Sequence, residues 1–388
     1  MINLTMDSRV SVNLSIQENG EEYVVGSIYT NEYIEVPEEA VFIIQKLDGN
    51  LTLEEVSQWI KKEHNIDLDV LDFVNDLREL NFLETIDGIV LIEPKNKILR
   101  NNKLTLLISN FFFNKASNLI YIIIFLSTIY LILFYEGLFP SYKDILVFNQ
   151  IGLSIFTIVL LTWTLTIIHE VGHFLAAYKI DIPVKFNLSI RMYWLVAEAD
   201  ISGLWSVPRN KRYVPFLAGI AFDSLVLFIS VILKIAVPLL ENIASLLVLL
   251  ITIRFISHFM VFLRTDVYYV IMNSLNVRSL HTTSIEYIKN KFRFSKLPEM
   301  KSNERNYIRI YSFVYLAGAI LSLCMLAFYS VPSMILMIRK TIDQLASLTT
   351  FANFLDGCLA MIVIIVNISL WLFGAKQKLK TYKLSKEI

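Results

Sequence analysis

The sequence predicts a polytopic α-helical membrane protein of about six spans, preceded by a small winged-helix-like α+β domain. Hydrophobic residues make up 55% of the 388 residues and charged residues only 18%, whereas soluble domains carry about 45–50% and about 25%. Long uncharged runs recur after residue 115. Residues 1–94 hold 20 acidic and 5 basic side chains (net −15), and residues 95–388 hold 15 and 30 (net +15). The acidic front of the chain is therefore expected to form a separate domain.

The composition also excludes several classes of protein. Two cysteines, Cys324 and Cys358, are too few for a disulfide scaffold or a thiolate zinc finger. Both lie in apolar runs and are expected to be small buried hydrophobic residues. The first 20 residues contain no basic segment followed by an apolar run, so no cleaved signal peptide is expected.

Six runs of residues are each long enough to cross a bilayer, which takes about 20 residues at 1.5 Å each. Three runs carry no charge: residues 116–135, 145–168 and 310–338. Three more contain ionisable side chains: residues 213–240, 243–272 and 349–375. Together they predict a six-span domain over residues 117–376, followed by a basic cytoplasmic tail at 377–388.

The loop charges predict the orientation of these spans. Lys and Arg cluster before the first run, after the second, after the fourth and in the tail, while the alternate loops hold few. By the positive-inside rule, both termini of this multi-pass protein lie in the cytoplasm. Residues 95–116 are expected to form a linker and an interfacial helix that leads into the first span. A simple extension of that span is the alternative.

The strongest chemical signal is the sequence His-Glu-Val-Gly-His at residues 169–173. The two histidines are four residues apart, so on a helix they share one face and can bind one Zn²⁺. Glu170 lies about 100° around the helix, where it can act as general base on a zinc-bound water. Ionisable side chains within a span are costly and usually functional. His169 and His173 are therefore predicted metal ligands and Glu170 the predicted catalytic residue.

A catalytic zinc site needs a third protein ligand and an open position. Asp266 is the leading candidate, because it lies near the cytoplasmic end of the fourth predicted span, level with the histidines if the second and fourth spans run parallel. His258, two helical turns deeper in the same span, is the competing ligand; the alternative is a buried histidine bonded to a neighbouring carbonyl. His64 and His281 are expected to be solvated.

These motifs resemble those of the site-2 protease family of membrane-embedded zinc metalloproteases. In that family a His-Glu-x-x-His on one span joins an Asp from a later span. His169, Glu170 and His173 match this pattern, and Asp266 matches as third ligand, although Val267 stands where the family often has Gly. The segment around Thr265, Asp266 and Tyr268 is closer to the peptide zinc metalloproteases of modified-peptide (epipeptide-type) gene clusters. The resemblance covers roughly residues 100–375 and implies a protein of a bacterial cell membrane.

A further family element is Gly-Pro-x-x-Asn in the span after the motif. Gly219, Ile220 and Asp223 occupy the corresponding positions here, so Pro and Asn are both replaced. Asp223 can orient water or a substrate carbonyl if it is protonated. Alternatively, it pairs with Arg254 across the third and fourth spans.

The segment 182–205 between the second and third spans alternates apolar and polar residues, which predicts short strands. An edge strand beside the zinc would hold a substrate peptide extended. An ordinary hairpin without substrate contact is the alternative.

The acidic front piece predicts strands at 23–28 and 33–36, a helix opened by Pro37, a second helix capped by Thr52, a third helix at 67–80, and a strand pair at 83–92. Three helices with small strands suggest a winged helix. Its third helix carries five acidic residues against Arg78 alone, which disfavours nucleic acid. The pattern resembles the small recognition domains that capture leader peptides. A docking domain for another subunit is the alternative.

Taken together, the sequence predicts a zinc metalloendopeptidase that binds one Zn²⁺ per chain and cuts a peptide near the cytoplasmic face. The family resemblance implies maturation of a ribosomally made, modified peptide. The expected partners are the peptide substrate, the lipid bilayer, and a peptide-modifying enzyme or exporter, but no nucleic acid. Two alternatives are an intramembrane protease of a membrane-anchored regulator and a non-catalytic transporter or immunity protein. An intact Glu170 speaks against the non-catalytic alternative.

Overall fold

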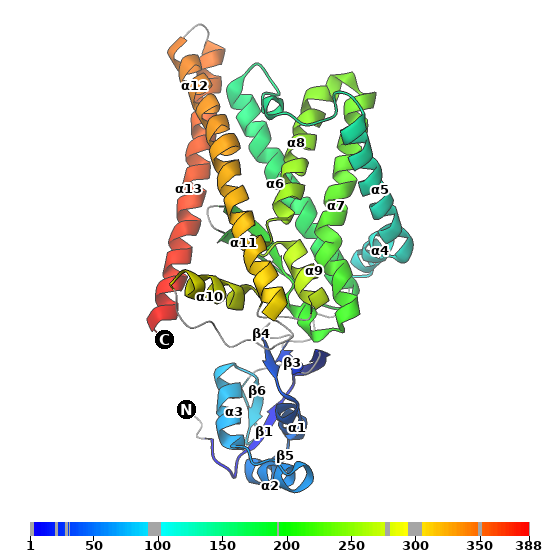
Figure 1. The fold of residues 1–388 in the computed structure, drawn as a ribbon, viewed down its shortest axis with the longest axis vertical. Coiled ribbons are helices and arrows are strands. Elements are labelled where there is room, and N and C mark those ends of the chain that lie inside the picture. Colours follow the sequence, from blue (N-terminus) through cyan, green and yellow to red (C-terminus); the bar gives the residue numbers. More distant parts are fainter. Residues whose placement is uncertain are drawn as a thin grey trace. The chain divides into compact units, whose positions relative to one another are not determined.

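The fold was analysed in a computed structural model, drawn in Figure 1. The structure describes residues 4–19, 22–27, 30, 32–91, 102–191, 194–275, 280–293, 305–347 and 351–387. The first part of the expected linker, residues 95–101, lies outside these residues. The chain divides into two compact units, which are described separately. One unit contains Met1–Ser109 with Ala177–Lys185 and Asp200–Tyr213, and the other contains Asn110–Ala176, Phe186–Ala199 and Val214–Ile388.

The N-terminal domain combines small antiparallel sheets with three helices. Its elements are β1 (Arg9–Val12), β2 (Ser15–Asn19), β3 (Glu22–Ser27), β4 (Glu32–Val36), α1 (Glu38–Lys46), β5 (Asp48–Thr52), α2 (Leu53–His64), α3 (Val70–Glu79), β6 (Leu83–Ile86) and β7 (Ile89–Val90). One sheet has the order β5-β1-β6-β7 and the other the order β2-β3-β4. The three predicted helices and the predicted strands are present, whereas β1, β2 and β5 were not predicted.

Local sequence signals begin the helices of this domain, and one core holds them together. Pro37 precedes α1, and the Thr52 side chain and Glu55 form a reciprocal capping box at the start of α2. Asp69 caps α3 by accepting from the Asp72 N–H. The core is built from apolar side chains of the helices and of β1, β3, β4 and β6, with Val10, Val25, Leu53, Val74 and Ile86 fully buried. The domain thus has a hydrophobic core of its own.

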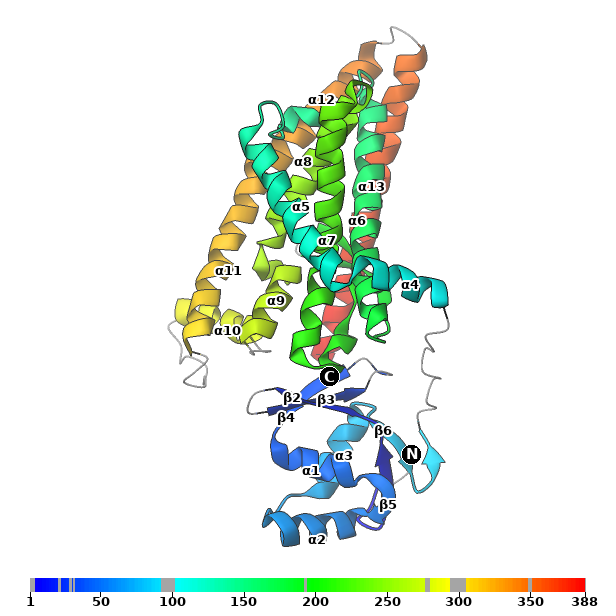
Figure 2. The same cartoon turned by 90° about the vertical axis from the view of Figure 1, so that its right-hand side faces the viewer.

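The rest of the described chain is mainly helical (Figures 1 and 2). The helices are α4 (Lys103–Phe112), α5 (Lys115–Phe134), α6 (Ile151–Lys179), α7 (Arg209–Ala236), α8 (Glu241–His258), α9 (Asp266–Leu275), α10 (Leu280–Phe292), α11 (Arg305–Met325), α12 (Val331–Ser347) and α13 (Phe351–Glu387). Six of the described helical segments are long and apolar enough to cross a membrane. The predicted polytopic helical fold is therefore confirmed at this level.

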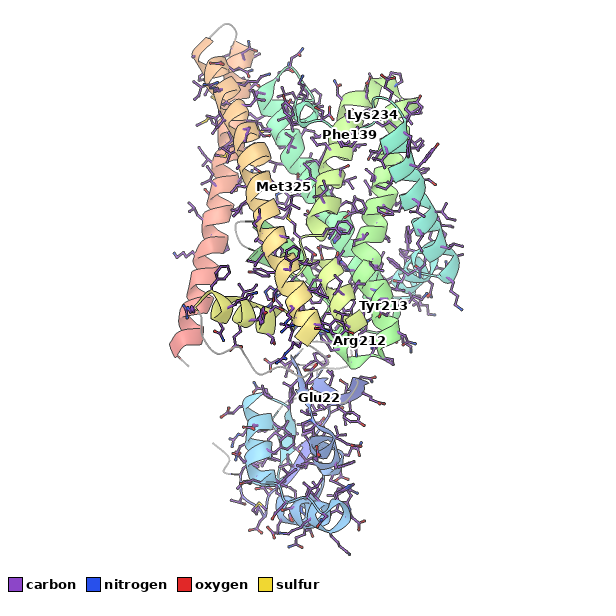
Figure 3. All side chains as sticks on the ribbon, viewed as in Figure 1. Glu22, Phe139, Arg212, Tyr213, Lys234 and Met325 are labelled. Carbon is purple, nitrogen blue, oxygen red and sulfur yellow. The ribbon has the colours of Figure 1, made fainter. Side chains whose placement is uncertain are left out.

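The long apolar helices bury one face against each other and expose large apolar side chains on the other. Leu165 of α6, Leu227 of α7 and Val248 of α8 pack in a buried cluster, and α5 to α8 lie side by side in Figure 2. Large apolar side chains on the outer face of α5, such as Leu126 and Leu133, are about 60% exposed, as expected for a lipid-facing helix. Figure 3 places Tyr213 and Lys234 at opposite ends of α7, which runs the length of the bundle. Cys324 is also exposed, so its predicted burial was wrong, because this part of α11 faces outward.

The predicted fourth span is broken. Residues 243–272 were expected to form one continuous helix, but α8 ends at His258 and α9 begins at Asp266. Between them lie a 3₁₀ turn, Val261–Leu263, and Arg264 in the left-handed region with φ 56°. The Thr265 hydroxyl donates to the His258 carbonyl at 2.6 Å, which satisfies a carbonyl at the end of α8. The break therefore places Asp266 at the first position of a new helix.

Helix α4 is separate from α5, as the interfacial-helix interpretation expected. The Asn114 side chain accepts from the Ser117 N–H and caps α5, and the Ser117 hydroxyl donates to the Phe111 carbonyl at 2.7 Å. Leu104, Leu107 and Phe111 of α4 are exposed. The alternative, a simple extension of the first span, is not found.

Asp356 of α13 explains one ionisable residue within a predicted span. Its carboxylate accepts from the backbone N–H groups of Gly152 at 2.9 Å and Leu153 at 3.0 Å. These groups lie in the first turn of α6, where backbone N–H groups lack partners within the helix. The charge therefore caps α6, the helix that carries the His-Glu-Val-Gly-His motif.

Candidate metal centre

The two motif histidines lie on one face of α6 and are both buried. His169 is 6% exposed and His173 is 3% exposed. Their spacing of four residues brings the two Nε2 atoms within 3.1 Å of each other. The helix continues through both residues to Lys179, so a rigid element holds them.

The other ring nitrogens of these histidines have fixed partners. His169 Nδ1 lies 2.8 Å from Asp223 Oδ2, and His173 Nδ1 lies 2.8 Å from the Pro215 carbonyl oxygen. A carbonyl oxygen and an ionised carboxylate can only accept a hydrogen bond. Each histidine Nδ1 therefore carries a proton and donates it to its partner. Each Nε2 then presents a lone pair to the centre of the site. This is the arrangement in which histidine binds a metal.

Asp266 completes the centre. Its Oδ2 lies 3.1 Å from His169 Nε2 and 3.3 Å from His173 Nε2, and this oxygen is buried without a hydrogen bond. Two nitrogen lone pairs and a carboxylate oxygen thus converge, and a bound cation would relieve their repulsion. Four ligands held about 2.0–2.1 Å from a tetrahedral Zn²⁺ lie about 3.3–3.4 Å apart. The donor set and its spacing therefore fit zinc.

Glu170 points to a different neighbour. Its Oε2 accepts from the backbone N–H of Ala199 at 2.6 Å. Ala199 belongs to β9 (Trp194–Asp200), which pairs with β8 (Lys185–Arg191) in a two-stranded sheet. Both predicted strands of the segment 182–205 are thus present. The carboxylate predicted as general base lies against one of them.

The buried Asp223 pairs with the partly buried Arg254 behind His169. Asp223 is 1% exposed, and its Oδ1 lies 3.4 Å from Arg254 Nη1. Arg254 also donates to the Leu165 carbonyl and the Thr166 hydroxyl, each at 2.8 Å. The pairing considered for Asp223 and Arg254 is therefore present. Asp223 also orients a predicted metal ligand, His169, a role that was not predicted from the sequence.

A spacing pattern on α7 is the signal that would have revealed this role. Pro215, Gly219 and Asp223 follow one another at intervals of four residues, so they share one face of α7. The Pro215 carbonyl accepts from His173, and Asp223 accepts from His169. Gly219 lies between them, where a Cβ atom would collide with the His169 ring and lie 2.6 Å from His173 Nε2. This face of α7 therefore shapes the space that the two imidazoles occupy.

Replacing Gly219 with alanine is expected to weaken zinc binding. The added methyl group must push the two imidazole rings out of position. Changes to the residues that hold metal ligands in place usually lower metal affinity by about 10–100-fold. Zinc affinity of the purified full chain, measured by competition with a chelating dye, checks this. The matched control is Gly357→Ala in α13, where the new methyl group would meet the flexible Leu345 side chain of α12 at 2.7 Å. Equal affinity in both variants would contradict the close approach.

The remaining histidines differ in their surroundings. His258 is buried beside the centre, and the described residues provide a second possible metal-binding group of His169, Asp223 and His258. His64 is half-buried and stacks on Phe42. His281 was expected to be solvated, but it is 9% exposed and its Nδ1 lies 3.0 Å from the Tyr311 hydroxyl. The expectation was wrong because residue 281 lies in α10, which packs on α11. Burial, assisted by the positive charge of Arg264, lowers the pKa of His281 to about 4.

No protein-family model, curated protein or solved structure matches this chain.

Proposed function

We propose that this chain is a membrane-embedded zinc endopeptidase similar to the site-2 proteases. The observation that carries the proposal is the convergence of His169 Nε2, His173 Nε2 and Asp266 Oδ2, with both Nδ1 protons engaged elsewhere. Glu170 follows the first of these residues directly in sequence. Six helices able to cross a membrane support the membrane location. Histidine and carboxylate side chains are typical ligands of catalytic zinc.

The side chains divide the proposed reaction among them. Zinc held by His169, His173 and Asp266 would polarise the scissile carbonyl and acidify water. Glu170 takes the proton of the attacking water and later delivers it to the departing amine. Asp223 fixes the orientation of the His169 ring and raises its basicity through the Nδ1 hydrogen bond. The Pro215 carbonyl orients His173 in the same way.

Strand β9 supports a peptide as the substrate. The Ala199 N–H donates to Glu170 on α6, so it is directed away from the partner strand β8. This edge of β9 therefore lies beside the proposed base. An extended peptide that pairs along this edge would bring its backbone to the catalytic carboxylate. The family resemblance favours a ribosomally made, modified peptide, and a membrane-anchored regulator is the second candidate.

We further propose that the N-terminal domain recognises that peptide. The helix-strand order α1-β5-α2-α3-β6-β7 supports a winged-helix-like fold, in which β1 is inserted between β5 and β6. The outer strands of the sheet β2-β3-β4 offer edges for strand addition. The net charge of −15 over residues 1–94 suits a basic or amphipathic leader. A docking module for another subunit is the competing function.

Residues 1–94 are expected to bind the substrate peptide in a salt-dependent manner. Exposed charges are screened beyond about 8–10 Å at physiological ionic strength, so affinity should fall as salt rises. Titration of the full chain and of residues 1–94 with peptides encoded beside the gene measures this. Absence of binding at low salt, together with intact processing by a chain that starts near Lys95, would favour the docking module.

A cleavage assay tests the protease proposal itself. The full chain, purified in lipid nanodiscs with zinc, is incubated with the same peptides, and mass spectrometry identifies the products. Cleavage at one bond that stops when a chelator removes the metal is expected. If zinc is bound but no candidate peptide or membrane-anchored regulator is cut, the non-catalytic scaffold becomes the better explanation.

A further inference from the structure

His258 stands out among the buried polar side chains that the proposed reaction does not use. It is 7% exposed at the end of α8. Neither ring nitrogen has a hydrogen-bond partner among the described residues. The ring is stacked on that of His169, with centroids 5.2 Å apart and planes inclined by 14°. A buried imidazole carries at least one N–H, and leaving it without an acceptor costs free energy.

The two nitrogens of His258 face two different carboxylates. His258 Nε2 lies 3.6 Å from Asp223 Oδ2, and His258 Nδ1 lies 3.7 Å from Asp266 Oδ2. Both distances are just outside the hydrogen-bonding range. One of these carboxylates is a proposed metal ligand, and the other orients His169. His258 therefore lies between the two acidic groups that shape the centre.

Two other roles for His258 fit these observations less well. As a fourth ligand it would need a nitrogen near all three converging atoms, but the compact group of His169, His173 and Asp266 does not include it. A second cation between His169, Asp223 and His258 would compete with the guanidinium of Arg254, which already lies 3.4 Å from Asp223. It would also displace the proton that His169 Nδ1 donates to Asp223.

We propose that His258 is a positioning residue, which donates its ring N–H to one of the two flanking carboxylates, Asp266 or Asp223, and so tunes metal affinity without binding the metal. This inference rests on the proposed zinc site. The break between α8 and α9 makes it possible, because a continuous helix would separate residues 258 and 266 by about 12 Å along its axis. The Thr265 hydroxyl bond to the His258 carbonyl links the two segments.

Two variants of the full chain separate the positioning role from packing. His258→Phe keeps a flat ring against His169 but removes both nitrogens, and His258→Gln keeps an N–H donor but removes the ring. Zinc affinity is measured by competition with a chelating dye, and zinc content by elemental analysis. We expect His258→Phe to weaken binding by about 10–100-fold, the usual range for residues that support metal ligands. His258→Gln should recover most of that loss, and both variants should still bind one zinc at saturation.

The spectrum of the cobalt-substituted protein supplies a readout independent of activity. An unchanged ligand field in His258→Phe at saturating cobalt supports positioning, whereas loss of a nitrogen ligand would make His258 a ligand instead. Wild-type affinity in His258→Phe would overturn the proposal, and so would a fall in zinc content from two ions to one. If the wild-type chain itself binds no zinc, the proposed zinc site fails, and that result is distinct from a failure at His258.

Discussion

Replacing Glu170 with glutamine is expected to abolish peptide cleavage while zinc remains bound. The amide cannot accept a proton from the attacking water, and general-base catalysis contributes about 10²–10⁴-fold. Glutamine has nearly the same shape and can still accept from the Ala199 N–H, so the local structure should persist. Cleavage of a processed peptide, followed by mass spectrometry, measures the loss, and elemental analysis measures the retained zinc.

The matched control is Glu136→Gln, which makes the same chemical change at an exposed residue beyond the end of α5. This variant should cut the peptide at the wild-type rate. Unchanged cleavage by Glu170→Gln would contradict the protease proposal, because the proposed reaction has Glu170 as its general base. Loss of zinc together with loss of activity would instead indicate that Glu170 supports the metal centre.

The residues of the candidate site were predictable where a local rule applied. Histidines four residues apart on a helix must share a face, so His169 and His173 follow from sequence alone. Asp266 required one further step, the parallel course of two spans. The role of Asp223 was missed because it depends on which face of α7 meets α6. That information is present only as the interval between Pro215, Gly219 and Asp223.

The fold shows a similar division between long and short signals. The presence of six membrane-crossing helices was predictable because each long apolar run provides enough residues to cross a bilayer. Strands β1, β2 and β5 are only four or five residues long and hold at most two large apolar residues each, so their pairing depends on the sheet rather than on local preference. The break at residues 259–265 was missed for another reason. This segment is mostly apolar and resembles a helix by composition, and its turn relies on Arg264 and Thr265.

Removing any one of the three proposed ligands is expected to lower zinc content from about one ion per chain to well below that value. The variants His169→Ala, His173→Ala and Asp266→Ala each leave two donors, too few to retain the ion against a chelator. Asp223→Asn keeps all three donors and alters only the support of His169, so it should weaken affinity by a smaller factor of about 10–100. Elemental analysis after dialysis, together with dye competition, distinguishes these two levels of effect.

The graded result is the test, because a general loss of folding would affect all four variants alike. Asp343→Ala, at an exposed position on α12, is the control for the removal of a carboxylate and should keep a full complement of zinc. If Asp266→Ala kept its full zinc content and a His258 variant lost zinc, the third ligand would be His258 and not Asp266. The shared geometry explains why this comparison is decisive: Asp266 Oδ2 lies 3.1 Å and 3.3 Å from the two Nε2 atoms, while His258 Nδ1 lies 3.7 Å from Asp266 itself. A metal ion held by His169 Nε2, His173 Nε2 and Asp266 Oδ2 would therefore depend on Asp266 directly. It would depend on His258 only through the effect of His258 on Asp266.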